Sequence, residues 1–275
     1  MAEVFGISET VVRFGSFAAV FAVMAIAEAV RPRRERHFPR SRRWVTNLGI
    51  VALDSLFIRL LFPLVAVGAA EIASARSIGL LNQIDLPPLA EGLVAVVLLD
   101  MAIYWQHVIF HKVPVLWRLH MVHHADPDFD VTTALRFHPI EIGLSMLLKI
   151  ALVFLIGPSA VAVVVFEVVL NGMAMFNHAN ARLPAGLDRV LRLAVVTPDM
   201  HRVHHSTIQP ETDSNYGFNL SIWDRVFGSY VEQPRGGHEG MAIGLDDFPG
   251  ETPTGIGWAL AAPFTASRTG SKPAQ

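Results

Sequence analysis

Residues 89–124 read LAEGLVAVVLLDMAIYWQHVIFHKVPVLWRLHMVHH, and this stretch decides the fold. Its first part, residues 89–110, is apolar and long enough to cross a bilayer, because a helix rises about 1.5 Å per residue and roughly 20 residues span the hydrocarbon layer. Five histidines stand at and beyond the end of this span, namely His107, His111, His120, His123 and His124. The stretch therefore predicts a membrane helix that delivers several imidazoles to one membrane surface.

Four other stretches are apolar enough to enter a bilayer: residues 11–30, 48–70, 140–156 and 159–176. The composition agrees, since 52% of the 275 residues are hydrophobic and 17% are charged. The last two stretches are short and meet at Gly157 and Pro158, which break a helix, so they form either a thin spanning pair or a dipping hairpin. We expect an all-α, integral membrane helical bundle of four to five segments; the alternative is a buried bundle of a soluble protein.

The arginines indicate an orientation. Residues 31–43 read RPRRERHFPRSRR and hold seven arginines, whereas residues 71–88 hold only Arg76. By the positive-inside rule the arginine-rich loop is cytoplasmic, in a bacterial protein on the inner membrane. Counting spans from this loop places the ends of the third and fifth segments, and everything after residue 179, on the same side, so we expect a cytoplasmic helical cap. The net charge of −2 does not indicate nucleic acid as a partner, and lipid headgroups suit the arginines better.

The absence of cysteine excludes disulfides, iron–sulfur clusters, thiolate zinc sites and a cysteine nucleophile. No basic region precedes the first apolar segment, so we interpret it as a retained span rather than a cleaved signal. We expect one membrane domain over residues 1–275, with a histidine-rich core at residues 100–230. The tail, residues 246–275, is expected to be partly disordered, with residues 256–264 able to lie on the membrane surface.

The spacing of the histidines indicates metal binding. HVIFH occupies residues 107–111, HMVHH residues 120–124 and HRVHH residues 201–205. On a helix, positions i, i+3 and i+4 lie on one face, so the three rings of each H-x2-H-H motif are expected to point into a common space. Imidazole suits iron, zinc, copper or nickel, and eight rings exceed what one ion accepts, so the pattern predicts two ions. We interpret His37 and His238 as ordinary hydrogen-bonded residues.

These motifs, in this order, resemble the fatty acid hydroxylase superfamily, which includes sterol desaturases, sterol methyl oxidases, sphingolipid hydroxylases and alkylglycerol monooxygenase. The resemblance runs from about residue 107 to residue 230 and covers HVIFH, VPVLWRLHMVHHAD, RFHPIE, FNHAN, TPDMHRVHHS and NYGFNLSIWDRVFGSY. It implies a non-haem centre of two iron ions that uses O2. The core ligands implied are His107, His111, His120, His123, His124, His201, His204 and His205.

The resemblance also implies one or two further ligands, for which His178 and then His138 are the candidates. Some members carry H-x3-H near His178, where this chain has Ala174. Many members have a fused cytochrome b5 domain, and no such segment stands out here, so the electrons are expected from an external donor, a separate reductase or electron carrier. The implied substrate is a sterol, fatty acyl or related lipid, either hydroxylated or desaturated.

Carboxylates near the histidine motifs are candidates to support the ligands, because metal-bound imidazoles usually donate their second N–H to a carboxylate or carbonyl. The candidates are Glu141, Asp199 and Asp224. Asp199 also fits a helix cap, and the two roles are compatible.

Asp100 lies inside an apolar span, where a carboxylate is costly and normally faces a protein interior. With Tyr104, His107 and His111 it follows helical spacing, which predicts a stripe that leads from a lipid cavity to the metals, with Asp100 binding a substrate hydroxyl. The alternative is a structural hydrogen bond to another helix, such as one bearing Asn47 or Glu167.

Other functions fit the pattern less well. A metal transporter or metal-binding protein is the main alternative, but transporters place ligands near the bilayer midplane on repeated halves, whereas these histidines lie at helix ends and no repeat is visible. A bis-histidine haem protein does not need tandem H-x2-H-H motifs. A zinc hydrolase uses fewer histidines, and no H-E-x-x-H is present.

Overall fold

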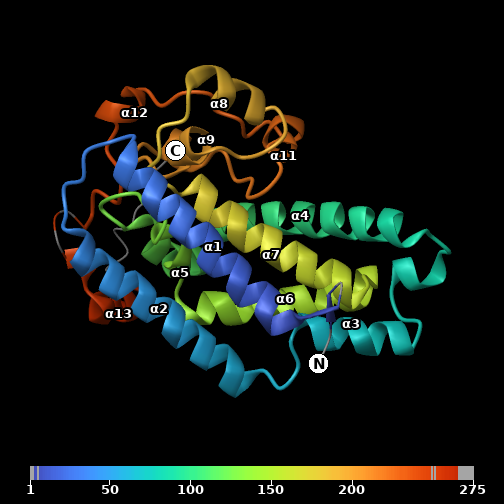
Figure 1. The fold of residues 1–275 in the computed structure, drawn as a ribbon. Helices are drawn as coiled ribbons and strands as arrows, with labels where there is room; N and C mark the ends of the chain where they lie inside the picture. Colours follow the sequence, from blue (N-terminus) through green and yellow to red (C-terminus); the bar gives the residue numbers. More distant parts are fainter. Residues whose placement is uncertain (1–2, 5, 249, 251, 266–275) are drawn as a thin grey trace.

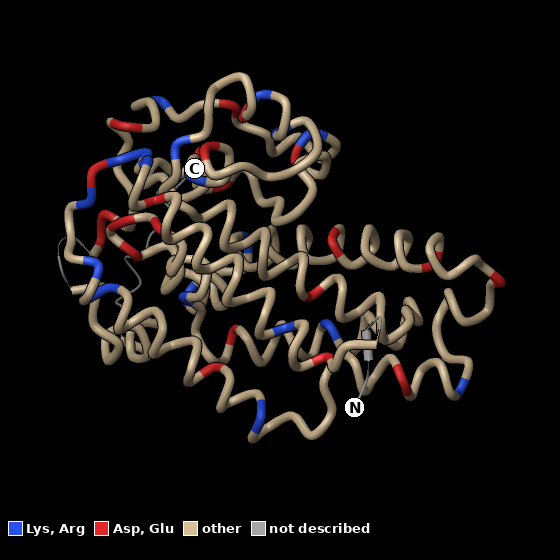
Figure 2. The backbone as a smooth tube through the Cα atoms, viewed as in Figure 1, with Lys and Arg blue, Asp and Glu red and all other residues tan. Residues whose placement is uncertain are grey.

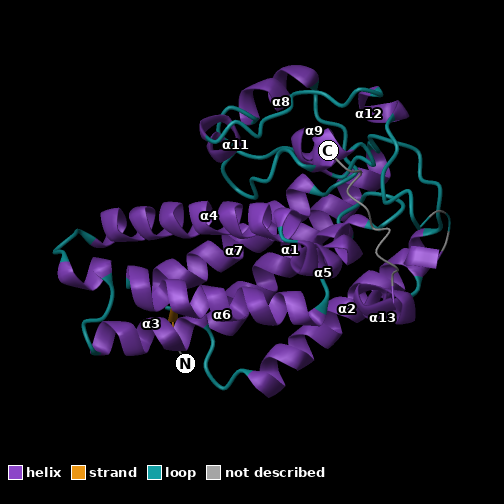
Figure 3. Ribbon diagram, turned by 180° about the vertical axis from the view of Figure 1, so that it is seen from behind, coloured by secondary structure: helices purple, strands orange, loops and turns teal. Residues whose placement is uncertain are grey.

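The fold is helical, as predicted, in a computed structural model that describes residues 3–4, 6–248, 250 and 252–265. The long helices are α1 (Glu9–Val30), α2 (Arg40–Leu61), α4 (Pro88–Lys112), α6 (Pro139–Ile156) and α7 (Ala160–Asn177). The short helices are α3 (Ala66–Ala75), α5 (Pro114–His124), α8 (Ala185–Leu191), α9 (Pro198–His204), α10 (Gln209–Thr212), α11 (Ile222–Val226), α12 (Gly237–Gly240) and α13 (Ile256–Thr265). The 3-10 turns are η1 (Leu80–Gln83), η2 (Thr133–Leu135) and η3 (Thr252–Thr254). A two-stranded antiparallel ribbon, β1 (Glu3–Val4) and β2 (Ile7–Ser8), precedes α1 (Figure 3).

The long helices lie side by side (Figure 1). α1, α4 and α7 end, and α2 and α6 begin, at the same end of the bundle, called the shared end below. α1 packs along α7, α7 along α4, and α2 against α6. A β-bridge between Pro32 and Ala181 joins the chain after α1 to the chain after α7, and the backbone N–H of Arg33 donates to the carbonyl of Asn180 at 2.9 Å. The arginine loop and the end of α7 therefore meet, as the span count predicts.

Five segments are long and apolar enough to cross a membrane. Large apolar side chains are exposed along them: Phe14 and Leu60 are each 72% exposed and Leu89 75%. In contrast, most charged residues lie toward the shared end and its cap (Figure 2). An apolar outer surface on long helices is the arrangement that a lipid environment requires, and it is that of an integral membrane protein.

The second apolar segment is divided into two helices. α2 ends at Leu61, and Pro63 follows in a break before the ten-residue α3. Proline lacks a backbone N–H and its ring clashes with the preceding turn, so one continuous helix over residues 48–70 cannot form. The buried face of α3 carries small residues, among them Ala69 and Ala70, which allow it to pack closely on α6 and α7.

α6 and α7 form the expected hairpin. Gly157 ends α6 in the left-handed conformation, with φ of 72°, and Ser159 caps α7 by accepting the N–H of Ala162 at 3.2 Å. Each helix has 18 residues, so each is about 27 Å long. That length is close to the hydrocarbon thickness of about 30 Å and favours a thin spanning pair over a hairpin that only dips into the membrane.

A cap of short helices, α8 to α12, covers the shared end of the bundle (Figures 1 and 3). The tail returns to the bundle as α13, which packs on α5 and α2, and the Arg118 Nε donates to the carbonyl of Pro263 at 2.7 Å. The disorder predicted for the end of the tail falls on residues 266–275, which lie outside the described residues.

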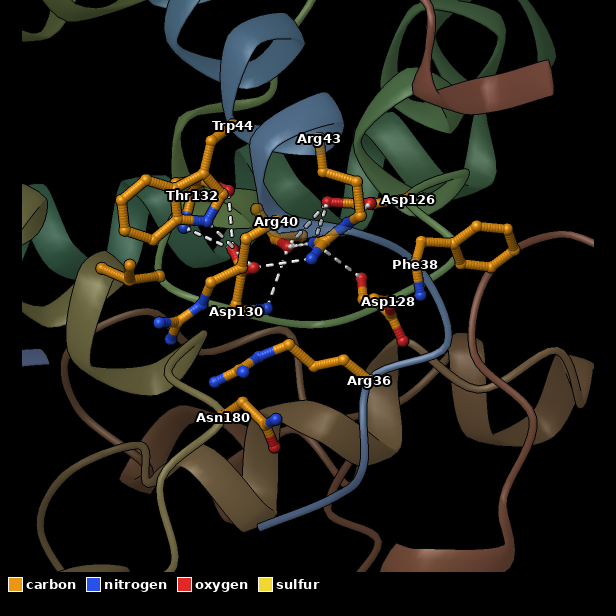
Figure 4. A network of polar contacts seen from close by, with 12 residues as sticks. Arg36, Phe38, Arg40, Arg43, Trp44, Asp126, Asp128, Asp130, Thr132 and Asn180 are labelled. Atoms are coloured by element: carbon orange, nitrogen blue, oxygen red, sulfur yellow. Dashed lines mark hydrogen bonds and ion pairs between the residues drawn. The ribbon is translucent and has the colours of Figure 1, made fainter. Parts of the chain in front are cut away.

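A buried charge network fixes the loop that follows α5 (Figure 4). The Arg43 guanidinium donates to both oxygens of Asp126 at 2.7 Å and to Asp130 at 2.6 Å. All three side chains are at most 1% exposed. Asn47 and Thr133 also donate to Asp126, at 3.1 and 2.8 Å. Because Asp126 comes two residues after the end of α5, the network anchors the helix that carries HMVHH.

Candidate metal centre

Nine histidines meet in two groups at the shared end of the bundle. The first group consists of His107, His111, His120, His124 and His204, and the second of His123, His178, His201 and His205. Within each group, one ring nitrogen of every histidine lies within 4.8 Å of the others. All nine side chains are buried, with at most 3% exposed. The histidines that the sequence places on four separate segments therefore converge, as expected.

Helix geometry decides which ring joins which group. Each pair spaced i, i+4 stays together, and these pairs are His107 with His111, His120 with His124, and His201 with His205. Neighbouring residues on a helix point about 100° apart, so His123 and His124 separate into different groups, with ring planes at 86°. The expectation that all three rings of an H-x2-H-H motif share one space was wrong: each motif serves both groups.

Several rings are oriented through Nδ1, which lies against a backbone carbonyl. The pairs are His107 with Tyr216 (2.7 Å), His204 with Ser214 (2.7 Å) and His178 with Ala174 (2.8 Å). A carbonyl only accepts hydrogen bonds, so each Nδ1 carries the proton and each Nε2 keeps a free lone pair. The backbone carbonyl of Ala174 thus orients the ring of His178.

The Nε2 atoms of the grouped histidines indicate that each group can hold a metal ion. The Nδ1–H of His107 donates to a carbonyl, so its Nε2 presents a lone pair, and this atom lies only 3.2 Å from the Nε2 of His120. The buried Nε2 atoms of His124, His204 and His205 have no hydrogen-bond partner among the described residues. Buried polar atoms are nearly always paired. A cation in each group would supply the missing partner.

The rings are also in the protonation state that metals require. Burial lowers the pKa of His120 and of His178 to about 3, so both imidazoles are neutral near pH 7. Metal ligation needs neutral imidazole. The two groups adjoin each other, since the ring centroids of His124 and His205 are 4.5 Å apart, which suits a pair of ions.

A cavity of about 380 Å³ opens between α2, α4, α6 and α7 and reaches the first group. His107 and His120 line its inner end, and apolar side chains such as Ile58, Met146 and Leu170 line the rest. A lipid chain that enters from the membrane can therefore approach the histidines without crossing the cap.

Sequence comparison places these features in a known group. A model of the fatty acid hydroxylase family matches residues 92–229, just over half of the chain. The chain belongs to the fatty acid hydroxylase family. The match covers all nine grouped histidines and confirms the resemblance seen in the motifs.

The curated relatives act on lipids. Ornithine lipid hydroxylase OlsE of Rhizobium tropici is 31% identical over 190 residues, which are 68% of this chain and 53% of that protein. Alkylglycerol monooxygenase of Xenopus tropicalis is 36% identical over 49% of this chain and 29% of its own length, and the Homo sapiens protein 33% over 48% and 28%. The match thus spans about half of the first relative and under a third of the others. No solved structure matches the chain significantly.

In this member of the fatty acid hydroxylase family, Glu141 contacts a grouped histidine, as expected. Its Oε1 lies 2.6 Å from the Nδ1 of His120, and both residues are at most 4% exposed. This contact fixes the orientation of the His120 ring and so the direction of its Nε2, the usual arrangement around a metal-bound imidazole.

Replacing Glu141 by glutamine is therefore expected to weaken metal binding about 10- to 100-fold, the usual loss when a partner of a metal-binding histidine is removed. Titration of the purified apoprotein with ferrous ion measures the change. Glu71→Gln, on the exposed surface of α3, is the matched control. Equal affinity of both variants would mean that Glu141 does not position His120.

Asp199 and Asp224 do not touch the grouped imidazoles. Asp199 pairs with Arg33 at 3.2 Å and with Arg202, whereas α9 is capped by the Thr197 hydroxyl, so neither role expected for Asp199 is found. Asp224 accepts the backbone N–H of Tyr216 at 2.7 Å. It thereby holds the loop whose carbonyl orients His107, and acts through the backbone rather than on a ring.

Asp100 and Tyr104 join α4 to the cap instead of lining the cavity. The indole N–H of Trp223 donates to Asp100 at 2.8 Å, and the Tyr104 hydroxyl contacts the Ser229 hydroxyl at 2.8 Å. Asp100 therefore makes a structural hydrogen bond, but to the segment around Trp223 rather than to Asn47 or Glu167. Of the four residues in the predicted substrate stripe, only His107 lines the cavity.

His138 lies outside both groups. Its Nδ1 accepts the N–H of Ile140 at 3.2 Å, so the ring caps α6. His37 is exposed beside Asp128 and takes no part in either group. His238 is buried, with its Nε2 3.7 Å from Asp199. Neither of its ring nitrogens has a hydrogen-bond partner among the described residues, so it is not the hydrogen-bonded residue that was expected.

Proposed function

We propose that this protein is an O2-dependent oxidoreductase that hydroxylates a C–H bond of a membrane lipid at two iron ions held by the nine grouped histidines. The observation that carries the proposal is the opposed Nε2 pair of His107 and His120, 3.2 Å apart at the inner end of a membrane-facing cavity. Membership of a lipid-oxidising family supports it. We leave His138 out of the ligand set, because its ring is used to cap α6.

Breaking an unactivated C–H bond needs an oxidant stronger than any side chain, and two bound iron ions would supply it by activating O2. The residues of this chain contribute position and environment. The carbonyls of Tyr216 and Ser214 fix two rings, and the apolar helices around the cavity hold the lipid chain and exclude water. For hydroxylation the balance is RH + O2 + 2 electrons + 2 protons giving ROH + H2O, so a separate reductase or electron carrier must donate the electrons.

The source of the product oxygen tests this function. With ferrous ion, an electron donor and 18O2, a hydroxylated lipid product is expected to carry the heavy isotope, because an oxygenase transfers an atom of O2. The measurement is mass spectrometry of lipids incubated with the purified protein. Label drawn only from water would mean hydrolysis, and an unlabelled alkene formed only with O2 would mean desaturation. Metal transport without any oxidised lipid would favour the transporter alternative.

We further propose that the shared end of the bundle faces the cytoplasm, where the arginine-rich loop between α1 and α2 meets anionic headgroups. Reporter fusions after residue 40 and after residue 275 are expected to report the cytoplasmic side together. Reporters on opposite sides of the membrane would contradict this topology.

A further inference from the structure

The histidine end of the cavity contains three oxygen atoms that lack hydrogen-bond donors. They are Oδ1 of Asp54, Oε1 of Gln106 and Oε2 of Glu141, which are buried and have no partner among the described residues. All three residues line the same cavity. They come from three different helices, α2, α4 and α6, so the acceptors surround the space rather than lie along one wall.

The three acceptors lie close to the proposed reaction site. Gln106 directly precedes His107, and Glu141 is in contact with His120 through its other oxygen. Asp54, on α2, lines the same cavity as Glu141. The amide nitrogen of Gln106 is already used by the Ser145 hydroxyl, which leaves its oxygen to accept.

The far end of the cavity differs. There Glu167 also lines the wall, but Lys149 occupies one of its oxygens at 2.6 Å and Arg13 the other at 2.5 Å. Lys149 lies eight residues beyond Glu141 on α6, a distance of about 12 Å along the helix. Unpartnered acceptors therefore gather at the histidine end, whereas the charge of Glu167 at the far end is already neutralised by Lys149 and Arg13.

Unpartnered acceptors in a buried site are costly, and a hydrocarbon chain cannot satisfy them. A ligand that donates hydrogen bonds can. As ionised carboxylates, Asp54 and Glu141 only accept hydrogen bonds, as the amide oxygen of Gln106 does, and in that state the site fits hydroxyl or ammonium groups and disfavours esters and other groups that only accept. A site built in this way strongly rejects analogues that lack the donor.

We propose that the substrate is a lipid with hydrogen-bond-donating groups, hydroxyl or protonated amine, next to the carbon that is oxidised, and that Asp54, Gln106 and Glu141 bind these groups. The apolar chain of the lipid extends toward Ile58 and Leu170. This inference rests on the proposed function in taking the cavity as the substrate site.

Binding of three lipids with equal chains tests the inference: hexadecylglycerol, hexadecylamine and methyl palmitate, the last an acceptor only. Native mass spectrometry of the metal-loaded protein in detergent measures each affinity without turnover. At least one donor-bearing lipid is expected to bind on the order of tenfold more tightly than methyl palmitate, the value of one or two hydrogen bonds to a charged group. The preferred lipid identifies the donor as hydroxyl or ammonium.

Substitutions at Asp54 locate the effect, because this residue touches no grouped histidine. Asp54→Leu is expected to remove the preference. Asp54→Asn keeps one oxygen acceptor and the volume, so it is expected to retain a preference for hydroxyls and to lose one for the amine. Asp85→Asn, an exposed carboxylate in the loop before α4, is the control and is expected to change neither affinity nor metal content.

Equal binding of the three lipids by the unaltered protein would overturn the inference, as would a preference that survives Asp54→Leu in a variant with normal metal content. The outcomes also separate the two proposals. Selective binding without oxidation of any lipid would contradict the proposed function alone. Oxidation of methyl palmitate as fast as of the donor-bearing lipids would contradict the present inference alone.

Discussion

Replacing His204 by alanine is expected to abolish lipid oxidation, with a loss of more than about a hundredfold. Removing only the hydrogen-bond partner of a metal ligand costs up to about a hundredfold, and removing the ligand itself should cost more. His204 is fully buried in the first group. Its Nδ1 is held by the carbonyl of Ser214 at 2.7 Å, and its Nε2 has no partner among the described residues. Alanine would therefore remove one ligand and leave the remaining ligand set incomplete.

Metal content and activity are measured together on the purified protein. The unaltered chain is expected to hold two irons, and His204→Ala to lose metal. His37→Ala is the matched control, because its ring is 67% exposed and belongs to neither group. His238 is a poor control, since it is buried beside Asp199. Active protein with one iron at full occupancy, or equal damage from both substitutions, would contradict the two-ion site.

Replacing Arg43 by methionine is expected to lower the free energy of unfolding by about 3 to 5 kcal/mol, the usual cost of removing one partner of a buried ion pair. The change leaves Asp126 and Asp130 buried without their cation (Figure 4). Because these residues anchor the chain after α5, iron content is expected to fall as well. Unfolding in detergent, followed by heating or denaturant, gives the stability.

Two further variants test whether loss of the buried ion pairs is the cause of the lower stability. Arg59→Met, on the exposed surface of the same helix, is expected to have little effect on stability. Arg43→Lys keeps the charge but cannot make the two-pronged contact with Asp126, so an intermediate loss is expected. If Arg43→Met and Arg59→Met unfold alike, the buried network does not stabilise the loop after α5.

The sequence predicted the membrane helices and the convergence of the histidines, because both follow from short-range rules. The length of an apolar stretch predicts a membrane span, and the number of spans between His107 and His178 places both residues on the same side of the membrane. It could not predict which i, i+4 pairs share a group with one another, since that depends on how α5 and α9 are rotated against the bundle. Pro63 is visible in the sequence, but the residues on both sides of it are similarly apolar, so the start of a separate helix α3 could not be recognised.

Supporting contacts were predictable only where a side chain makes them. Glu141 was identified because a carboxylate near a histidine motif is a visible signal. The carbonyls of Tyr216 and Ser214 carry no signal, since every residue has one. The partners of Asp100 and Asp199 were missed because they lie far away in the sequence, at Trp223 and Arg33. Likewise, only tertiary structure shows that Asp126 meets Arg43.

Both histidine groups need residues of the HRVHH motif: the first takes His204, and the second takes His201 and His205. During synthesis, all five membrane-crossing segments leave the ribosome before this motif does. Neither group can be complete until the membrane part has been inserted and the cap has closed over it. If the groups hold iron, the nascent chain passes through the translocation machinery without a complete site, and loading is a late step of maturation. The supply of iron would then act on the finished protein and not on its insertion.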